Sequence, residues 1–161
     1  MQTATLSAQA TPGARPAPQF TMTLSEGRRD GTMAPYQQVL VVKLTNISKQ
    51  VIDRALCDSG GEQYNLEVVY DGVPVEKTDA ELKWRKQHET GPCTGLPRVE
   101  HTKPGEDRFD TLYYNTTKPG TYEITVTKET SPGQPEKSVT VRSNTLTIEV
   151  PEPEPEDNVP Q

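Results

Sequence analysis

Hydrophobic side chains alternate with polar ones along most of the chain, a period of two that is typical of half-buried β-strands. The clearest strand covers Tyr122 to Thr127, and the same alternation runs from Tyr64 to Tyr70. Further strands are expected at 20–24, 39–44, 51–56, 108–113 and 138–150, the last interrupted at 142–144. Seven to nine short strands separated by turns predict an all-β fold, an antiparallel β-sandwich.

Two turns punctuate this pattern. Asp71 and Gly72 stand between two alternating segments, and Asp-Gly there indicates a hairpin because a type I′ turn needs positive φ at both central residues. Pro74, in the returning strand, donates no ladder hydrogen bond, so this strand is expected at a sheet edge. Pro119 and Gly120 form the second turn, ahead of the clearest strand.

One segment has helical signals. Thr78 is followed three residues later by Glu81, which is the spacing of a capping box. We expect a short helix or an ordered insertion near 79–88, with Trp84 covering one end of a sheet. The basic side chains of this segment are expected to form its solvated face: Lys83, Arg85 and Lys86.

Composition explains the two ends of the chain. Hydrophobic residues make up only 31% of the 161 residues, with 15 prolines and a net charge of −6, which is close to the composition of disordered chains. Residues 1–19 contain no acidic side chain, whereas residues 151–161 alternate Pro and Glu and favour an extended tail. A low-complexity arm, one domain over residues 20–150 and a C-terminal tail are therefore expected. The acidic balance argues against a general nucleic-acid binder. The sequence also contains no run of about 18 apolar residues, the length that a membrane-spanning helix needs.

Cysteine usage and the first ten residues bear on the compartment. Cys57 and Cys93 are the only cysteines and lie in Gly-rich segments. They are compatible with one disulfide, or with two unpaired thiols in a reducing compartment. Residues 8–10 read Ala-Gln-Ala, which resembles a signal-peptidase motif with too few residues before it for a full signal. We expect an exported protein (periplasmic, cell-surface or extracellular) whose signal peptide is absent from this chain; the alternative is a plain low-complexity arm.

No catalytic or nucleotide-binding motif is present, so we expect no enzymatic activity and no cofactor. A cysteine nucleophile needs a base within hydrogen-bond reach, and the spacing of the cysteines and histidines is not that of a zinc finger: Cys57, His88, Cys93 and His101. Carboxylates that could bind calcium lack the loop spacing it requires and are expected on the solvated surface: Asp53, Asp58, Glu106, Asp107 and Asp110. Glycosylation sequons begin at Asn46 and Asn115, but we expect Asn46 to cap a strand and Asn115 to lie in a turn.

An ordered set of segments resembles a bacterial family of immunoglobulin-like (Ig-like) modules, found mainly in exported proteins of unknown function. The segments are Leu44–Ser48, Val68–Val75, Lys103–Glu106, and Pro119–Tyr122 followed by Val141–Ile148. The resemblance covers residues 20–150 and implies an Ig-like sandwich in which Tyr122 is a tyrosine-corner residue, its hydroxyl bonded to nearby backbone. The pattern is also distantly similar to the bacterial intracellular proteinase inhibitor domain. The Cys57–Cys93 pair and both tails fall outside the family pattern.

Two non-enzymatic functions follow, both involving protein partners. The first is a structural or interaction module whose sheet edges accept a strand, with an arm that pairs with a neighbouring molecule to build a chain or filament: Thr3, Ala4, Thr5, Leu6, Ser7 and Ala8. Alternatively, this arm is disordered or adds a strand to its own domain. The second function, implied by the distant similarity, is protease inhibition through the loop at 131–137 or at 89–99.

Overall fold

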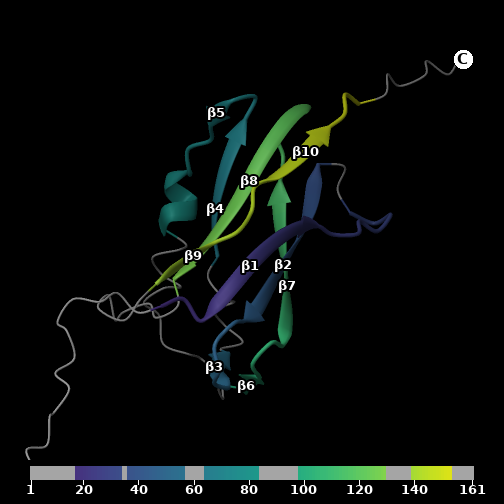
Figure 1. The fold of residues 1–161 in the computed structure, drawn as a ribbon. Helices are drawn as coiled ribbons and strands as arrows, with labels where there is room; N and C mark the ends of the chain where they lie inside the picture. Colours follow the sequence, from purple (N-terminus) through teal and green to yellow (C-terminus); the bar gives the residue numbers. More distant parts are fainter. Residues whose placement is uncertain (1–16, 34–35, 57–63, 84–97, 130–138, 154–161) are drawn as a thin grey trace, which may run out of the picture.

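The computed structural model describes residues 17–33, 36–56, 64–83, 98–129 and 139–153. This part of the chain forms ten strands, and its only helical residues are 79–83 (Figure 1). The strands are β1 (Phe20–Glu26), β2 (Gln37–Asn46), β3 (Ile52–Leu56), β4 (Asn65–Tyr70), β5 (Val73–Pro74), β6 (Arg98–Thr102), β7 (Asp107–Asn115), β8 (Gly120–Glu129), β9 (Thr140–Arg142) and β10 (Leu146–Val150).

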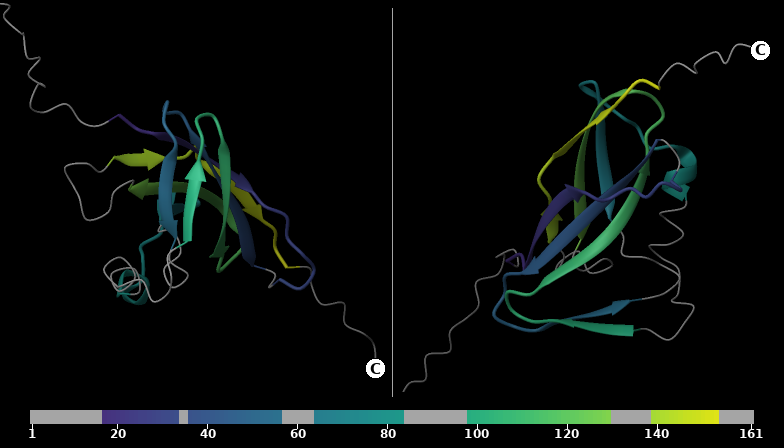
Figure 2. Two further views of the ribbon diagram at one scale, coloured as in Figure 1. Left: turned by 90° about the horizontal axis from the view of Figure 1, so that it is seen from below. Right: turned by 90° about the vertical axis from the view of Figure 1, so that its right-hand side faces the viewer.

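Two antiparallel sheets enclose the hydrophobic core (Figures 1 and 2). One sheet has the strand order β1-β2-β7, and the other has the order β10-β8-β4-β5, with β9 also paired to β8. The centre of the core comes from facing strands, because Leu40 and Val42 of β2 and Ile124 and Val126 of β8 are all completely buried. Alternate residues of each strand supply this single inner layer. The structure confirms the predicted all-β antiparallel sandwich.

A two-stranded ribbon of β3 and β6 extends from the first sheet (Figure 2). The sequence did not predict β6, since strands were expected to resume only after the turn at 103–106. The reason is that the five residues of β6 include one apolar side chain, Val99, so no alternation is visible. β3 follows β2 in the chain and β6 precedes β7, so the ribbon continues these two neighbouring strands beyond the sheet.

Asn46 stands where the ribbon leaves the sheet and is completely buried. Its Nδ2 donates to the carbonyl oxygens of Gln50 and Thr102, at 2.8 and 2.9 Å. Its Oδ1 accepts from the backbone N–H of Ser48 at 2.9 Å and from the Ser48 hydroxyl at 2.8 Å. The amide therefore uses all its donors and acceptors in the strand cap, and its burial excludes glycosylation of the folded protein.

The hairpin at Asp71-Gly72 has the backbone of a type I′ turn, with φ of 45° and 81° at its central residues. It leads into the two-residue strand β5, which places Pro74 at the edge of its sheet. The helical segment 79–83 begins with the capping box, since Thr78 N–H donates to Glu81 Oε2 at 2.8 Å and Glu81 N–H to Thr78 Oγ1 at 3.2 Å. Residues 84–88, including Trp84, lie outside the described residues.

The turn before β8 is held by two tyrosines. Tyr122 Oη donates to the carbonyl oxygen of Lys118 at 2.9 Å, and Tyr70 Oη donates to that of Pro119 at 2.7 Å. Gly120 has a φ of 136°, and a Cβ there would lie 2.7 Å from the Tyr70 ring. Only glycine fits this position, because the backbone has left-handed φ and passes directly over an aromatic ring.

The break between β9 and β10 joins the two sheets at one side of the sandwich. Asn144 Oδ1 accepts from Leu24 N–H at 2.7 Å, and its Nδ2 donates to the Leu24 carbonyl at 3.0 Å. Leu24 belongs to β1, the edge strand of the other sheet. Ser143 completes the break, because its Oγ accepts from Val126 N–H at 2.9 Å.

One strand boundary differs from the prediction. Asn115, expected in a turn, is the last residue of β7 and pairs with Gln37. The pairing continues one step further, since Thr116 N–H donates to the carbonyl oxygen of Tyr36 at 2.9 Å. Partner backbone on β2 therefore extends the strand beyond the apolar alternation that marks it in the sequence.

Candidate functional site

Most of the predicted site residues fall outside the described part of the chain. Cys57, Cys93 and the arm at 3–8 are among them, so the disulfide and the role of the arm stay predictions. The loop at 131–137 and all of 89–99 except its last two residues, which begin β6, are also outside. Asp58 and His88 lie there too.

The described side chains considered as metal ligands, and expected not to bind a metal, have other partners. His101 Nδ1 lies 2.6 Å from Asp53 Oδ1, and both side chains are exposed on the β3–β6 ribbon. Glu106 accepts from Lys103 N–H in a turn, and Asp107 accepts from the Thr45 hydroxyl. Within the described ranges, no three metal-ligating side chains of His, Cys, Asp or Glu come together.

Asp110 corrects a prediction, because it faces inward rather than lying on the solvated surface. It accepts a hydrogen bond from Tyr64 Oη at 2.5 Å. Arg108, two residues earlier on β7, also faces inward and pairs with Glu100 of β6, and its guanidinium lies 3.9 Å from Asp110. Lys128 Nζ of β8 lies 5.0 Å from the centre of the Tyr64 ring. Five polar side chains thus come together from β6, β7, β8 and the residue before β4 at the ribbon end of the sandwich.

Burial sets the electrostatics of this interior cluster. Desolvation lowers the pKa of Lys128 to about 8, although the negative charge of Asp110 opposes the shift. Desolvation and the hydrogen bond to Asp110 raise the pKa of Tyr64, so its phenol stays protonated. Desolvation also lowers the pKa of Arg108. Removing these charges from water therefore costs free energy, and the ion pairs and hydrogen bonds of the cluster offset part of that cost while they connect the two sheets.

Lys128 makes stability depend on pH in the alkaline range. Its pKa lies below the ordinary 10.5, so between about pH 8 and 10 the unfolded chain binds more protons than the folded one. Lys128 should therefore contribute a rise of about 2 kcal/mol to the free energy of unfolding over this interval. Urea denaturation at several pH values would measure the rise. Lys128→Met should abolish it and stabilise the protein at pH 7, whereas the exposed Lys103→Met should keep it; a rise that persists without Lys128 would contradict this assignment.

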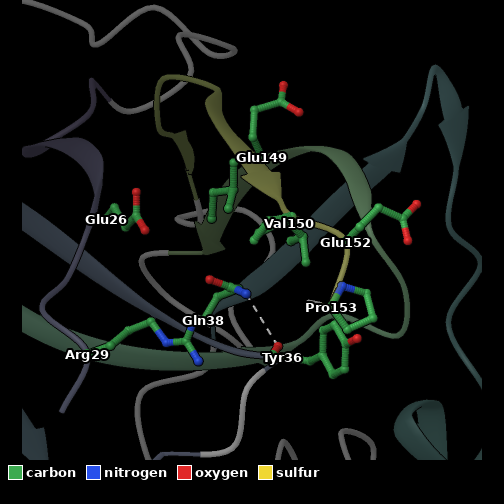
Figure 3. Close-up of a pocket in the computed structure, with 10 residues that line it drawn as sticks. Glu26, Arg29, Tyr36, Gln38, Glu149, Val150, Glu152 and Pro153 are labelled. Carbon is green, nitrogen blue, oxygen red and sulfur yellow. Dashed lines mark hydrogen bonds between the residues drawn. The ribbon is translucent and has the colours of Figure 1, made fainter. Parts of the chain in front are cut away.

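One pocket of about 210 Å³ lies between the start of β2 and the end of β10 (Figure 3). Tyr36, Gln38, Val150 and Pro153 line it, and Gln38 Nε2 donates to the Tyr36 carbonyl across 3.4 Å. In Figure 3 the carboxylate of Glu149, at its rim, points away from the pocket. Its volume is below the roughly 300–1,000 Å³ of small-molecule sites, so the pocket is poorly suited to a substrate.

The edge of β7 that faces away from β2 is a second candidate site in the described part of the chain. Two backbone hydrogen bonds lie at the ends of the β2–β7 pair: Asn46 N–H donates to the Glu106 carbonyl at 3.1 Å, and Thr116 N–H donates to the Tyr36 carbonyl at 2.9 Å. Both involve even-numbered residues, so the even-numbered residues of β7 are the ones that bond to β2. The odd-numbered residues of β7 therefore direct their N–H and C=O groups to the opposite edge. No described strand pairs with that edge.

Two aromatic side chains flank this edge on the outer face of the sheet. Phe109 is 63% exposed and Tyr113 is 61% exposed, with the exposed Thr111 between them. Across the pair, Thr111 lies opposite Val41 and Tyr113 lies opposite Val39. The result is an exposed strip of Phe109, Thr111 and Tyr113, next to the buried Val39 and the half-buried Val41, beside backbone groups that no described strand pairs with. The alternation on β7 could have revealed the strip, but not that the edge beside it is open.

Comparison with known proteins adds no relative: no family model matches the chain, and no curated protein matches it. The helical residues that are described form no helix long and apolar enough to cross a membrane.

Proposed function

We propose that this protein is a non-enzymatic structural and interaction module outside the cytoplasm, and that the edge of β7 accepts an extended strand from a protein partner. In strand addition, backbone hydrogen bonds supply affinity and alternate side chains supply specificity. The β7 edge offers both: outward N–H and C=O groups at every second residue, and the exposed rings of Phe109 and Tyr113 beside them. This combination is the observation that carries the proposal.

The other edges of the two core sheets are protected, as edges of natural proteins usually are. β5 has two residues, one of them Pro74. β1 has its Leu24 backbone engaged by Asn144. β10 carries Glu149 and is followed directly by Pro151. By contrast, β7 has nine residues without proline, and Asp107 is the one charged side chain among its outward-facing positions.

The extracytoplasmic location rests on the sequence. The Ala-Gln-Ala motif at residues 8–10 and the even number of cysteines support it. A disulfide between Cys57 and Cys93 would be in keeping with such a compartment.

Selection of short random peptides that bind the full chain tests strand addition. Bound peptides should slow amide hydrogen exchange at Phe109, Thr111 and Tyr113, whose N–H groups face the open edge, while the intervening amides change little. The double variant Phe109→Ser/Tyr113→Ser should weaken these peptides roughly tenfold or more.

Val73→Ser is the matched control, because Val73 is 65% exposed on the edge strand β5 of the other sheet. It should leave peptide affinity unchanged. Binders that protect no alternating set of β7 amides, or that ignore the double variant, would overturn the proposal.

A further inference from the structure

We propose that the strand that occupies the β7 edge is the N-terminal arm of a second copy of this chain, with Leu6 seated between Phe109 and Tyr113. This inference rests on the proposed function and identifies its partner. The arm is the six-residue segment that alternates hydroxyl and apolar side chains, without charge, Pro or Gly: Thr3, Ala4, Thr5, Leu6, Ser7 and Ala8. That period of two suits a strand with one apolar face.

The side chains of β7 select one register for an antiparallel arm. With Leu6 opposite Thr111, Ala8 lies opposite Phe109 and Ala4 lies opposite Tyr113. These are hydrogen-bonded pairs, because the odd-numbered residues of β7 are the ones whose backbone groups face the edge. Small alanines then leave room for the two rings, and the one large apolar side chain of the arm lies diagonal to both, within reach at about 7–8 Å.

The polar side chains of the arm also find suitable neighbours in this register. Thr5 lies opposite the half-buried Leu112, and Ser7 lies opposite Asp110, a hydrogen-bond acceptor. A shift by one residue would turn Leu6 to the inner side of the extended sheet, next to Asp110 or Leu112, and the hydroxyls to the aromatic strip. The match of large with small side chains on the outer face therefore fixes the register.

The prolines of the linker between arm and sandwich favour a neighbouring molecule, although its length would reach either copy. Eleven residues, 9–19, separate Ala8 from the start of β1, a reach of roughly 35 Å when extended. β1 runs parallel to β7, two strands away in the same sheet. An antiparallel arm on its own β7 would require this linker to reverse direction, whereas its prolines at 12, 16 and 18 favour extension.

Donor and acceptor are different surfaces, so the contact is head-to-tail. Each molecule that receives an arm at β7 still has its own arm to give. Such a contact continues into an open chain unless its rotation happens to close a ring.

Complementary variants of the full chain test this inference by sedimentation velocity. The wild type should form oligomers that grow with concentration. Leu6→Asp puts a charge on the apolar face of the arm, and Phe109→Ser/Tyr113→Ser removes the two rings beside the edge of β7. Each variant alone should therefore be monomeric. Mixed together, the intact edge of the first and the intact arm of the second should give a one-to-one dimer that grows no further. Val73→Ser should assemble like the wild type, and equal thermal unfolding of all variants would show that they fold.

Three results would overturn the inference: a monomeric wild type, association that Leu6→Asp leaves unchanged, or no dimer in the mixture. A monomer whose arm amides are protected would identify pairing within one molecule and would also overturn it. If selected peptides still add to β7 in any of these cases, the proposed function stands and the identity of the partner fails. If no peptide protects β7, both fail.

Discussion

Replacing Tyr122 with alanine is expected to lower the free energy of unfolding by about 3–5 kcal/mol, a large part of the stability of a domain of this size. Tyr122 is only 2% exposed. Its ring packs against Tyr70 at a centroid distance of 4.8 Å and against Tyr114 at 6.3 Å. Truncation removes these contacts, opens a cavity between the sheets and deletes the hydroxyl that holds the turn at Lys118. Denaturant unfolding measures the loss.

Two companion variants separate packing from hydrogen bonding. Tyr122→Phe keeps the ring and removes the hydroxyl, which donates to the Lys118 carbonyl at 2.9 Å and accepts from Lys118 N–H at 3.4 Å, so it should cost about 1–2 kcal/mol. Tyr113→Ala removes a ring of similar size from the exposed face of β7 and should change stability by less than about 1 kcal/mol. Equal losses of unfolding free energy in Tyr113→Ala and Tyr122→Ala would contradict the inward packing of Tyr122.

Asn46→Ala should destabilise the protein by about 2–4 kcal/mol, because the buried Thr102 carbonyl and the partly buried Gln50 carbonyl lose their donor. The two carbonyl oxygens are those of Gln50 and Thr102, and Thr102 is itself buried. Since Gln50 precedes β3 and Thr102 ends β6, the effect should be greatest in the ribbon. Hydrogen exchange of β3 and β6, compared with that of the core strands, would show it.

Asn115 provides the matched control, since it begins the other sequon and is exposed at the end of β7. Asn115→Ala should change stability by less than about 0.5 kcal/mol. Asn46→Asp should be at least as harmful as Asn46→Ala, because a carboxylate oxygen would replace the amide that donates to the two carbonyls. An Asn46→Asp variant as stable as the wild type would contradict the role given to the Asn46 amide where the ribbon leaves the sheet.

The features that local chemistry determines could be predicted from the sequence. The alternation in β8 marks a strand wherever it is placed, and the spacing of Thr78 and Glu81 specifies a capping box. Asp71 and Gly72 satisfy the φ requirement of their turn by residue type alone. Each of these signals lies within a few residues of the structure that it specifies.

The features that depend on distant partners could not be predicted. β6 has almost no apolar alternation and is a strand because β3 pairs with it. Asp110 looks like a surface carboxylate until Tyr64, 46 residues away in the chain, supplies its hydrogen bond. The open edge of β7 is likewise a property of the strand order, which no local pattern contains.

The hydrogen bonds between Asn144 and Leu24 also influence how the protein would respond to tension. The start of β1 and the end of β10 lie at opposite ends of the sandwich (Figure 1), so a pull on the two termini slides one sheet along the other. Two hydrogen bonds between Asn144 and Leu24 oppose that sliding, and they must break together rather than in succession. Resistance to force is set by the rate of unfolding. An assembly of these molecules would therefore owe part of its tensile strength to one asparagine side chain.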